Sequence, residues 1–194
     1  MIGGMERIFR KTCKRYNVPD HAHFLTFSCF GRQPFLTKDR SRRWLIDALG
    51  SALVKLDFAL WAWVIMPEHV HLLVKPRQKT YSISTFLRSF KQPVTRAALR
   101  HVQAYAPGFL ERMLDVQPNG EYSYRFWQRG GGYDTNLWTP RFIADKIRYI
   151  HNNPVKRGLV SHAVDWEWSS ARDVAKLRQA PLLPLETEAH MWLW

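Results

Sequence analysis

The segment Met66–Val74 (MPEHVHLLV) constrains the fold more than any other stretch of this sequence. Successive side chains of a β-strand point to opposite faces, so a strand here would present His69 and His71 side by side on one face. The other face would bury three aliphatic side chains, those of Val70, Leu72 and Val74. Two imidazoles about 7 Å apart along a strand can bind one metal ion. Histidines in this pattern also occur in purely structural roles, so the surrounding sequence has to decide.

The residues just before the histidines predict that this strand belongs to a hairpin. Phe58–Met66 is almost continuously apolar, which indicates a strand buried on both faces. Pro67 cannot donate a ladder hydrogen bond and fits a tight turn, so the two strands should pair in antiparallel fashion. Glu68 could orient one histidine from behind, but an exposed turn carboxylate is the favoured interpretation.

Alternating apolar residues indicate two more strands, at His23–Phe30 and Tyr133–Trp138. Helical spacing indicates an amphipathic helix at Arg40–Leu56. A second pair of histidines, His21 and His23, stands at the start of the first strand without another ligand cluster nearby in the sequence. We therefore expect a structural role for this second pair.

A further helix is predicted from about Ser82, and Pro93 should kink or end it before helical spacing resumes toward His101. Residues 107–124 are uneven in pattern and rich in turn-forming residues, so we expect a loop there.

The last predicted helix has a clear start and a clear stop. Thr139 can cap its N-terminus and Pro140 suits the first helical position, whereas Pro154 disfavours helical geometry at the preceding residue, Asn153. One stripe of this helix is apolar and suits a core: Ile143, Ile147 and Ile150. A second stripe would face a rim or cleft, where a phenol, a cation and an amide could act together: Phe142, Lys146, Tyr149 and Asn153.

Charge points to the kind of partner. The chain has 29 Lys and Arg against 16 Asp and Glu, a formal net charge of +13, which attracts phosphate backbones or anionic membranes. The longest apolar run, Phe58–Met66, is too short to span a bilayer, and the N-terminus lacks the apolar core of a signal peptide. We therefore expect a cytoplasmic protein that binds nucleic acid rather than membrane. The only cysteines, Cys13 and Cys29, lack metal-ligand spacing.

Two stretches are candidates for contacts with phosphate. Residues 1–20 form a basic N-terminal arm, in which a solvated terminus is the alternative to phosphate contacts by Arg10, Lys11, Lys14 and Arg15. Residues 122–138 interleave aromatic side chains with Arg125, Arg129 and three consecutive glycines. Such aromatics can stack on unpaired bases, although a core strand after a flexible loop would have the same pattern.

Three separated motifs resemble the REP-associated tyrosine transposases, within the transposase family named for insertion sequence 200. They are Met66–Leu73, Tyr149–Val160 and Asp165–Ser170, and the resemblance covers roughly residues 23–170. It implies an HUH single-strand endonuclease of the α+β class. The expected architecture is a ferredoxin-like antiparallel sheet of about four or five strands, with helices on one face and a C-terminal catalytic helix. We place this catalytic domain at residues 21–175 and leave the tail, 176–194, without a role.

The resemblance also implies the site. It maps the metal-binding histidine pair onto His69 and His71, the nucleophile onto Tyr149 and a third metal ligand onto Asn153. A divalent ion, Mg²⁺ or Mn²⁺, would be the cofactor, and single-stranded or hairpin DNA, including REP-like repeats, the partner. Basic residues near the helix would contact this DNA: Lys146, Lys156 and Arg157. A monomer is favoured by the resemblance, and a dimer is compatible with it.

Two other classes of function fit parts of the sequence. A non-catalytic module that binds single-stranded nucleic acid would need only the charge and the aromatics. A zinc hydrolase would need a third strong ligand near the histidine strand, and the sequence shows none there.

Overall fold

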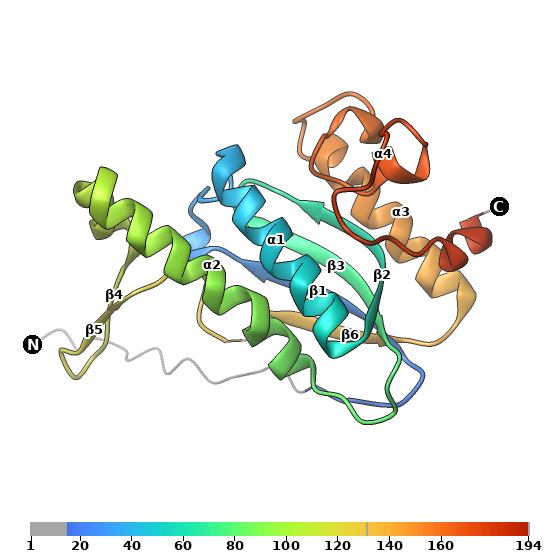
Figure 1. The fold of residues 1–194 in the computed structure, drawn as a ribbon, viewed down its shortest axis with the longest axis horizontal. Helices are drawn as coiled ribbons and strands as arrows, with labels where there is room; N and C mark the ends of the chain where they lie inside the picture. Colours follow the sequence, from blue (N-terminus) through green and yellow to red (C-terminus); the bar gives the residue numbers. More distant parts are fainter. Residues whose placement is uncertain (1–14, 131, 194) are drawn as a thin grey trace, which may run out of the picture.

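The computed structural model describes residues 15–130 and 132–193. Four of its strands form one antiparallel sheet in the order β2-β3-β1-β6 (Figure 1). Their bounds are β1 Ala22–Ser28, β2 Phe58–Ile65, β3 His69–Pro76 and β6 Tyr133–Leu137. One long helix connects β1 to β2 and another follows β3, so the order of elements is that of a ferredoxin-like fold. The predicted α+β class and sheet are confirmed.

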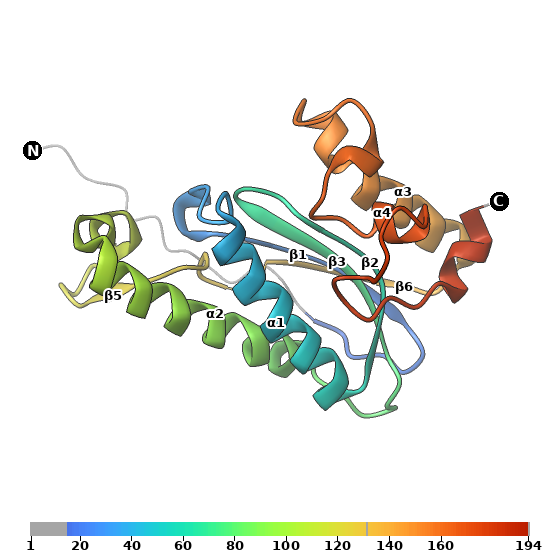
Figure 2. The ribbon, with the colours of Figure 1, turned by 45° about the horizontal axis from the view of Figure 1, so that its top comes forward.

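Two helices cover one face of the sheet, and Figures 1 and 2 show them side by side: α1 (Asp39–Leu56) and α2 (Ile83–Tyr105). The larger core lies between these helices and the strands. It contains the three aliphatic side chains of β3 that alternate with the histidines, Val70, Leu72 and Val74. The predicted alternation of β3 is therefore confirmed, and the histidines face the other way.

Helix α3 (Pro140–Lys156) covers the opposite face. The Thr139 side chain accepts a hydrogen bond from the backbone N–H of Phe142, and Pro140 occupies the first turn, as the sequence predicts. The predicted apolar stripe is buried against the sheet in a second, smaller core: Ile143, Ile147 and Ile150. A helix thus lies directly over the face that carries the histidines.

Strand β2 is buried along its whole length, as predicted, and contributes to both cores. A β-bulge between Leu60 and Ala62 breaks the alternation, so that Trp61 and Ala62 both pack in the smaller core.

Neither Pro93, predicted to kink or end its helix, nor Pro154, predicted to stop its helix at about Asn153, ends the helix that contains it, and the predicted helical pattern beyond Pro93 is confirmed. Helix α2 runs without interruption through Pro93, and α3 continues past Asn153 through Pro154 to Lys156. Each proline removes one backbone hydrogen bond, but buried side chains beyond it keep the helix packed. Val94 and Ala98 are buried in the larger core, and Pro154 is itself buried. Tertiary packing outweighs the lost hydrogen bond in both helices.

The expected loop at residues 107–124 is instead ordered into short elements, so that prediction is wrong. A 3-10 helix, Pro107–Met113, leads into a small hairpin of β4 (Leu114–Val116) and β5 (Tyr122–Tyr124). The hairpin lies near the C-terminal end of α2, far from α3 (Figure 2). Strands of three residues are too short for alternation to reveal them.

The C-terminal segment packs along the outer edge of β2. Leu185 forms a parallel bridge with Leu60, the Trp61 indole donates a hydrogen bond to Glu188, and His190 contacts the Trp61 carbonyl at 2.6 Å. Short helices complete this region and the β1–α1 connection: η1 Phe30–Arg32, η3 Ala163–Asp165, α4 Ala171–Val174 and η4 Glu188–Leu193. Within residues 15–130 and 132–193, no helix has the length and apolar character needed to cross a membrane.

Candidate active site

The two histidines of β3 converge on one point. Their Nε2 atoms are 3.1 Å apart, and both side chains are buried. The other ring nitrogens are held from behind, because His71 Nδ1 lies 2.7 Å from the Thr26 hydroxyl and His69 Nδ1 lies 3.1 Å from a Glu68 oxygen. The partners of the Nδ1 atoms fix both ring orientations, so the Nε2 lone pairs are directed at shared space.

Glu68 is buried, so the favoured expectation of an exposed turn carboxylate is wrong. The same Glu68 oxygen forms an ion pair with Arg157, at the end of α3, at 2.9 Å. The turn is held against the protein by backbone hydrogen bonds from Cys29 N–H to the Glu68 carbonyl and from Leu36 N–H to the Pro67 carbonyl. Glu68 therefore joins the histidine strand to the C-terminal end of α3.

Burial keeps both imidazoles neutral at pH 7. Desolvation lowers the pKa of His71 to about 3, and the pKa of His69 is also lowered by burial, with Glu68 opposing that shift. Neutral imidazole is the form that binds a metal ion.

Asn153 approaches the histidines from α3. Its amide nitrogen lies 3.1 Å from His71 Nε2, and its amide oxygen is buried without a hydrogen-bond partner among the described residues. The oxygen and nitrogen of an amide are assigned from the surrounding hydrogen bonds. Rotation of the Asn153 amide by 180° exchanges the two atoms and directs the oxygen toward His71. A buried carbonyl oxygen without a partner is costly, and a bound cation would satisfy it.

The separations suit ligands of a single ion. Two ligand atoms about 2.1 Å from one ion and about 90° apart are separated by about 3 Å, which is close to the observed Nε2 separation. Among the described residues, no group of three or more His, Cys, Asp or Glu side chains could hold a metal. Two imidazoles and an amide are a weaker set, and they fit a divalent ion that also binds oxygen atoms of a substrate.

Tyr149 lies beside this cluster on α3. Its side chain is 37% exposed, and its ring stands nearly perpendicular to those of His71 and Phe24, with ring centres 5.3 and 5.8 Å away. The ammonium groups of Lys146 and Lys156 lie 5.5 and 5.2 Å from the centre of the tyrosine ring. The structure thus brings together seven of the residues singled out in the sequence: His69, His71, Lys146, Tyr149, Asn153, Lys156 and Arg157.

The third motif positions α3, a role that the sequence did not reveal. His151 Nε2 lies 2.8 Å from the Ser170 hydroxyl, which also hydrogen-bonds to the backbone of Trp63 in β2. Trp166 donates its indole N–H to the Ile65 carbonyl at the end of β2. These contacts join the helix to the sheet through the Asp165–Ser170 motif, and only the pairing of distant segments could have shown it.

The remaining basic candidates lie elsewhere. Arg10, Lys11 and Lys14 are outside the described residues, so the basic arm stays a prediction there. Arg15 approaches Ser84 and Asp134, at 3.4 Å in each case. Arg125 and Arg129 pair with Asp115 on the α2 side of the sheet, and they line a pocket with Lys91 instead of approaching the histidines.

The core interpretation of the aromatic stretch 122–138 holds for part of it, and base stacking by the exposed part stays a prediction. Phe126 and Trp127 are buried in the larger core, whereas Tyr122, Tyr133 and Trp138 are exposed. In the pair of His21 and His23, the buried member, His23, has a structural role, as expected. His23 lies between Asp134, at 2.8 Å from its Nδ1, and Tyr81, at 2.7 Å from its Nε2.

Comparison with known sequences points to one family. A family model described as "Transposase IS200 like" matches residues 17–112, which include the histidine hairpin and end before α3. The REP-associated tyrosine transposase of Escherichia coli K12 is 25% identical over 169 residues, covering 84% of each chain. A protein of Haemophilus influenzae is 27% identical over 145 residues, which are 71% of this chain and 77% of that one.

A solved structure shares the fold. It is that of a REP-associated tyrosine transposase bound to a REP hairpin, with a TM-score of 0.66 and 22% identity, and it covers 93% of this chain and 96% of its own. The likeness therefore extends well beyond the residues that the family model matches.

Proposed function

We propose that this chain is an IS200-like transposase that cleaves and rejoins single-stranded DNA through a covalent bond to Tyr149, because the family model matches residues 17–112 and a REP-associated tyrosine transposase matches over 84% of the chain. The observation that carries this proposal is the convergence of His69, His71 and Asn153 beside a solvent-accessible tyrosine. A binding module would not require such a cluster.

The three converging side chains would hold a divalent cation, Mg²⁺ or Mn²⁺. When bound, such an ion polarises a phosphate and stabilises the negative charge that develops on it during attack. Thr26 and Glu68 contribute by holding the Nδ1 atoms of the histidines, so that both rings keep the orientation in which Nε2 faces the ion.

Tyr149 is the proposed nucleophile. Its oxygen would form a bond to the phosphorus while the bond from phosphorus to the 3′ oxygen breaks, and the phenol proton would be lost to solvent or a nearby base. The products are a 5′-phosphotyrosine and a free 3′-OH, and attack by a 3′-OH reverses the step. Rigid α3 and the perpendicular contacts with His71 and Phe24 would hold the ring in position.

The basic rim would bind the DNA strand. Lys146 and Lys156 flank the tyrosine ring and can neutralise the phosphates on either side of the one under attack. The partner we propose is single-stranded or hairpin DNA, including REP-like repeats, because the related structure is of a complex with a REP hairpin. An enzyme acting on chromosomal repeats would work in the cytoplasm.

The test is a denaturing gel of end-labelled single-stranded hairpin DNA with the protein and Mn²⁺. We expect a protein-linked band whose formation stops when the ion is chelated, and peptide mapping should place the nucleotide on Tyr149. An adduct on Tyr124 or Tyr133 with Tyr149 unmodified would overturn the assignment. Tight binding without any adduct would favour a non-catalytic binding module.

A further inference from the structure

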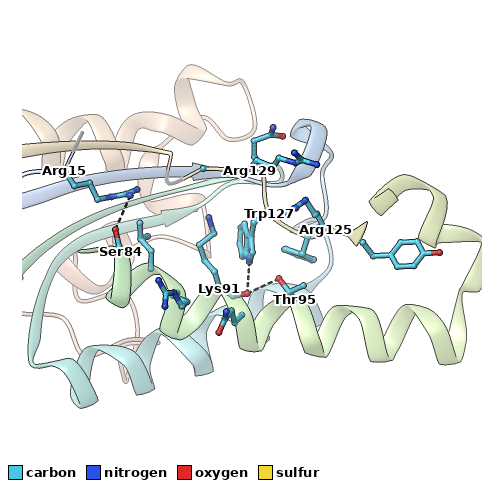
Figure 3. Close-up of a pocket in the computed structure, with 14 residues that line it drawn as sticks. Arg15, Ser84, Lys91, Thr95, Arg125, Trp127 and Arg129 are labelled. Carbon is cyan, nitrogen blue, oxygen red and sulfur yellow. Dashed lines mark hydrogen bonds between the residues drawn. The ribbon is translucent and has the colours of Figure 1, made fainter. Parts of the chain in front are cut away.

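A second concave region lies on the other face of the sheet, between α2 and residues 124–130 (Figure 3). Its volume is about 530 Å³, within the range of about 300–1,000 Å³ typical of small-molecule sites. Lys91 lies in this pocket, with its ammonium 5.2 Å from the centre of the Phe27 ring. Phe27 follows Thr26, which contacts His71, so β1 separates the pocket from the histidine site.

The residues that line this basic pocket include five cations and no carboxylate: Arg15, Arg88, Lys91, Arg125 and Arg129. Two carboxylates just outside it, Asp115 and Asp134, pair with three of the arginines. The lining therefore retains an excess of positive charge, which favours an anionic ligand.

Lys91 is the most informative of these residues. Its ammonium lies over the rings of Phe27 and Trp127, and no carboxylate of the described residues is within 4.0 Å of it. Burial lowers the pKa of Lys91 to about 8, with the charge of Arg15 adding to the shift. A partly desolvated cation without a counter-ion is costly to the fold, and an anion bound in the pocket would offset that cost.

The guanidinium groups of Arg125 and Arg129 are fixed in orientations that allow them to contact such an anion. The Nε atoms of both guanidinium groups donate to the same oxygen of Asp115, a buried residue. The terminal nitrogens of both have no partner in the part of the chain that the structure describes. Figure 3 shows both arginines on the side of the pocket opposite α2. Planar guanidinium groups fixed in this way can contact phosphate through two nitrogens at once.

The pocket also offers an aromatic wall. Tyr124 lines it and is only partly buried, so its ring remains accessible for stacking. Cations that bind phosphate next to an aromatic face that stacks on a base are the features of sites for unpaired nucleotides.

We propose that the basic pocket binds one unpaired nucleotide, with its phosphate between Lys91 and the guanidinium groups and its base against Tyr124. The site lies on the face of the sheet opposite the histidines, so a strand that is cut on one face would be recognised on the other. The choice of DNA as the source of this nucleotide rests on the proposed function, whereas the anion site itself rests on the pocket alone.

Chemical labelling of Lys91 tests the site in the intact protein. The protein is treated with an acetylating reagent at pH 8 with a chelator present, alone, with thymidine 5′-monophosphate or with a 20-nucleotide oligothymidylate, and each lysine is followed by mass spectrometry. We expect either ligand to slow Lys91 acetylation at least fivefold while exposed Lys55, on α1, changes less than twofold. Protection by the oligonucleotide alone would assign the site to a continuous strand, and protection by both would assign it to a single nucleotide unit. Lys91 labelling that neither ligand slows would overturn the proposal.

Variants provide an independent measurement. Lys91→Met removes the charge and keeps an unbranched side chain among the rings, and Arg88→Gln changes an exposed lining residue of α2. Exposed Arg100, on the same helix and outside the lining, gives the matched control Arg100→Gln. By fluorescence anisotropy, we expect about tenfold weaker oligonucleotide binding for Lys91→Met, a few-fold loss for Arg88→Gln, and a change below twofold for Arg100→Gln. Equal affinities for all three would overturn the proposal.

The outcomes separate this site from the catalytic one. If wild-type protein forms the DNA adduct but Lys91 is not protected, only the pocket proposal fails. If Lys91 is protected and no adduct forms, the transposase mechanism fails and the nucleotide site stands.

Discussion

The two faces of β1 differ in how they are built. Thr26 points to one face and holds the His71 imidazole at 2.7 Å, while Phe27 points to the other and lies under the ammonium of Lys91. The Thr26 face gathers neutral, buried ligands with cations at the rim, whereas the Phe27 face gathers cations around an open pocket. The alternation of one strand can therefore place catalysis and recognition back to back, and changes on one face should leave the other intact.

Of these variants, Tyr149→Phe is expected to have the largest effect on strand cleavage relative to its effect on DNA binding. This variant removes only the oxygen of the proposed nucleophile, so strand cleavage should fall by about 10³-fold or more while oligonucleotide affinity stays within about twofold. Quantitative denaturing gels and fluorescence anisotropy on the same preparation measure both quantities. Tyr133→Phe, which changes an exposed tyrosine of β6, is the matched control and should cleave normally.

A change in the histidine pair should have the next largest effect on strand cleavage. Replacing His71 with Ala removes one of the three converging groups, and cleavage should fall by about 10²-fold or more without loss of oligonucleotide binding. His162 is exposed, pairs with Asp165 and is not one of the converging groups, so His162→Ala controls for the loss of an imidazole. Normal cleavage by His71→Ala would show that the site is misplaced.

Gly132 offers a way to disturb both faces together. It has a φ of +71°, and a Cβ there would lie 2.0 Å from the carbonyl oxygen of Thr26. Gly132→Ala should therefore reduce the free energy of unfolding by about 3 kcal/mol, measured by urea denaturation. Gly120 also has a positive φ, of +83°, but open space around it, so Gly120→Ala should cost about 1 kcal/mol. Equal costs for the two would contradict the close approach at Thr26.

The smallest effect is a pH dependence confined to the pocket face. Lys91 loses its proton in the folded protein as the pH rises through about 8, while neighbouring Cys29, with a pKa raised to about 12 by burial, keeps its proton. Oligonucleotide affinity of the wild type should therefore fall about threefold between pH 7 and pH 9. The affinity of Lys91→Met should depend less on pH over the same range.

The lowered pKa of Lys91 also makes the stability of the protein depend on pH. The unfolded chain keeps the lysine proton up to the ordinary pKa near 10.5, whereas the folded protein releases it near 8. Between these values the unfolded state binds more protons, so the contribution of Lys91 to the free energy of unfolding rises with pH. Urea denaturation of the wild type and Lys91→Met between pH 7 and pH 10 measures this contribution.

The sequence predicted the elements whose signals are local. The hairpin around His69 and His71 could be predicted because alternation, an apolar run and a proline turn fall within 17 consecutive residues, 58–74. The start of α3 could be predicted because a threonine cap and a proline at the first position are adjacent in the chain.

Features that depend on distant contacts could not be predicted. Glu68 is buried because Arg157, some 90 residues later in the chain, reaches it from the end of α3. The helical spacing beyond Pro93 was visible in the sequence, but that α2 is one helix through the proline depends on the packing of its later turns on the core. The basic pocket exists only because α2 meets residues 124–130, so Lys91 carried no signal in the sequence.

The C-terminal segment also limits how the protein can assemble. Unpaired strand edges invite further strands, and here Leu185 and Ser169 occupy the outer edge of β2 through bridges to Leu60 and Val64. At the other end of the sheet, the outer edge of β6 pairs with no strand among residues 15–130 and 132–193. A sheet that is closed at one end can be extended only once, so two copies joined edge to edge would form a finite, two-fold pair and could not grow into a filament.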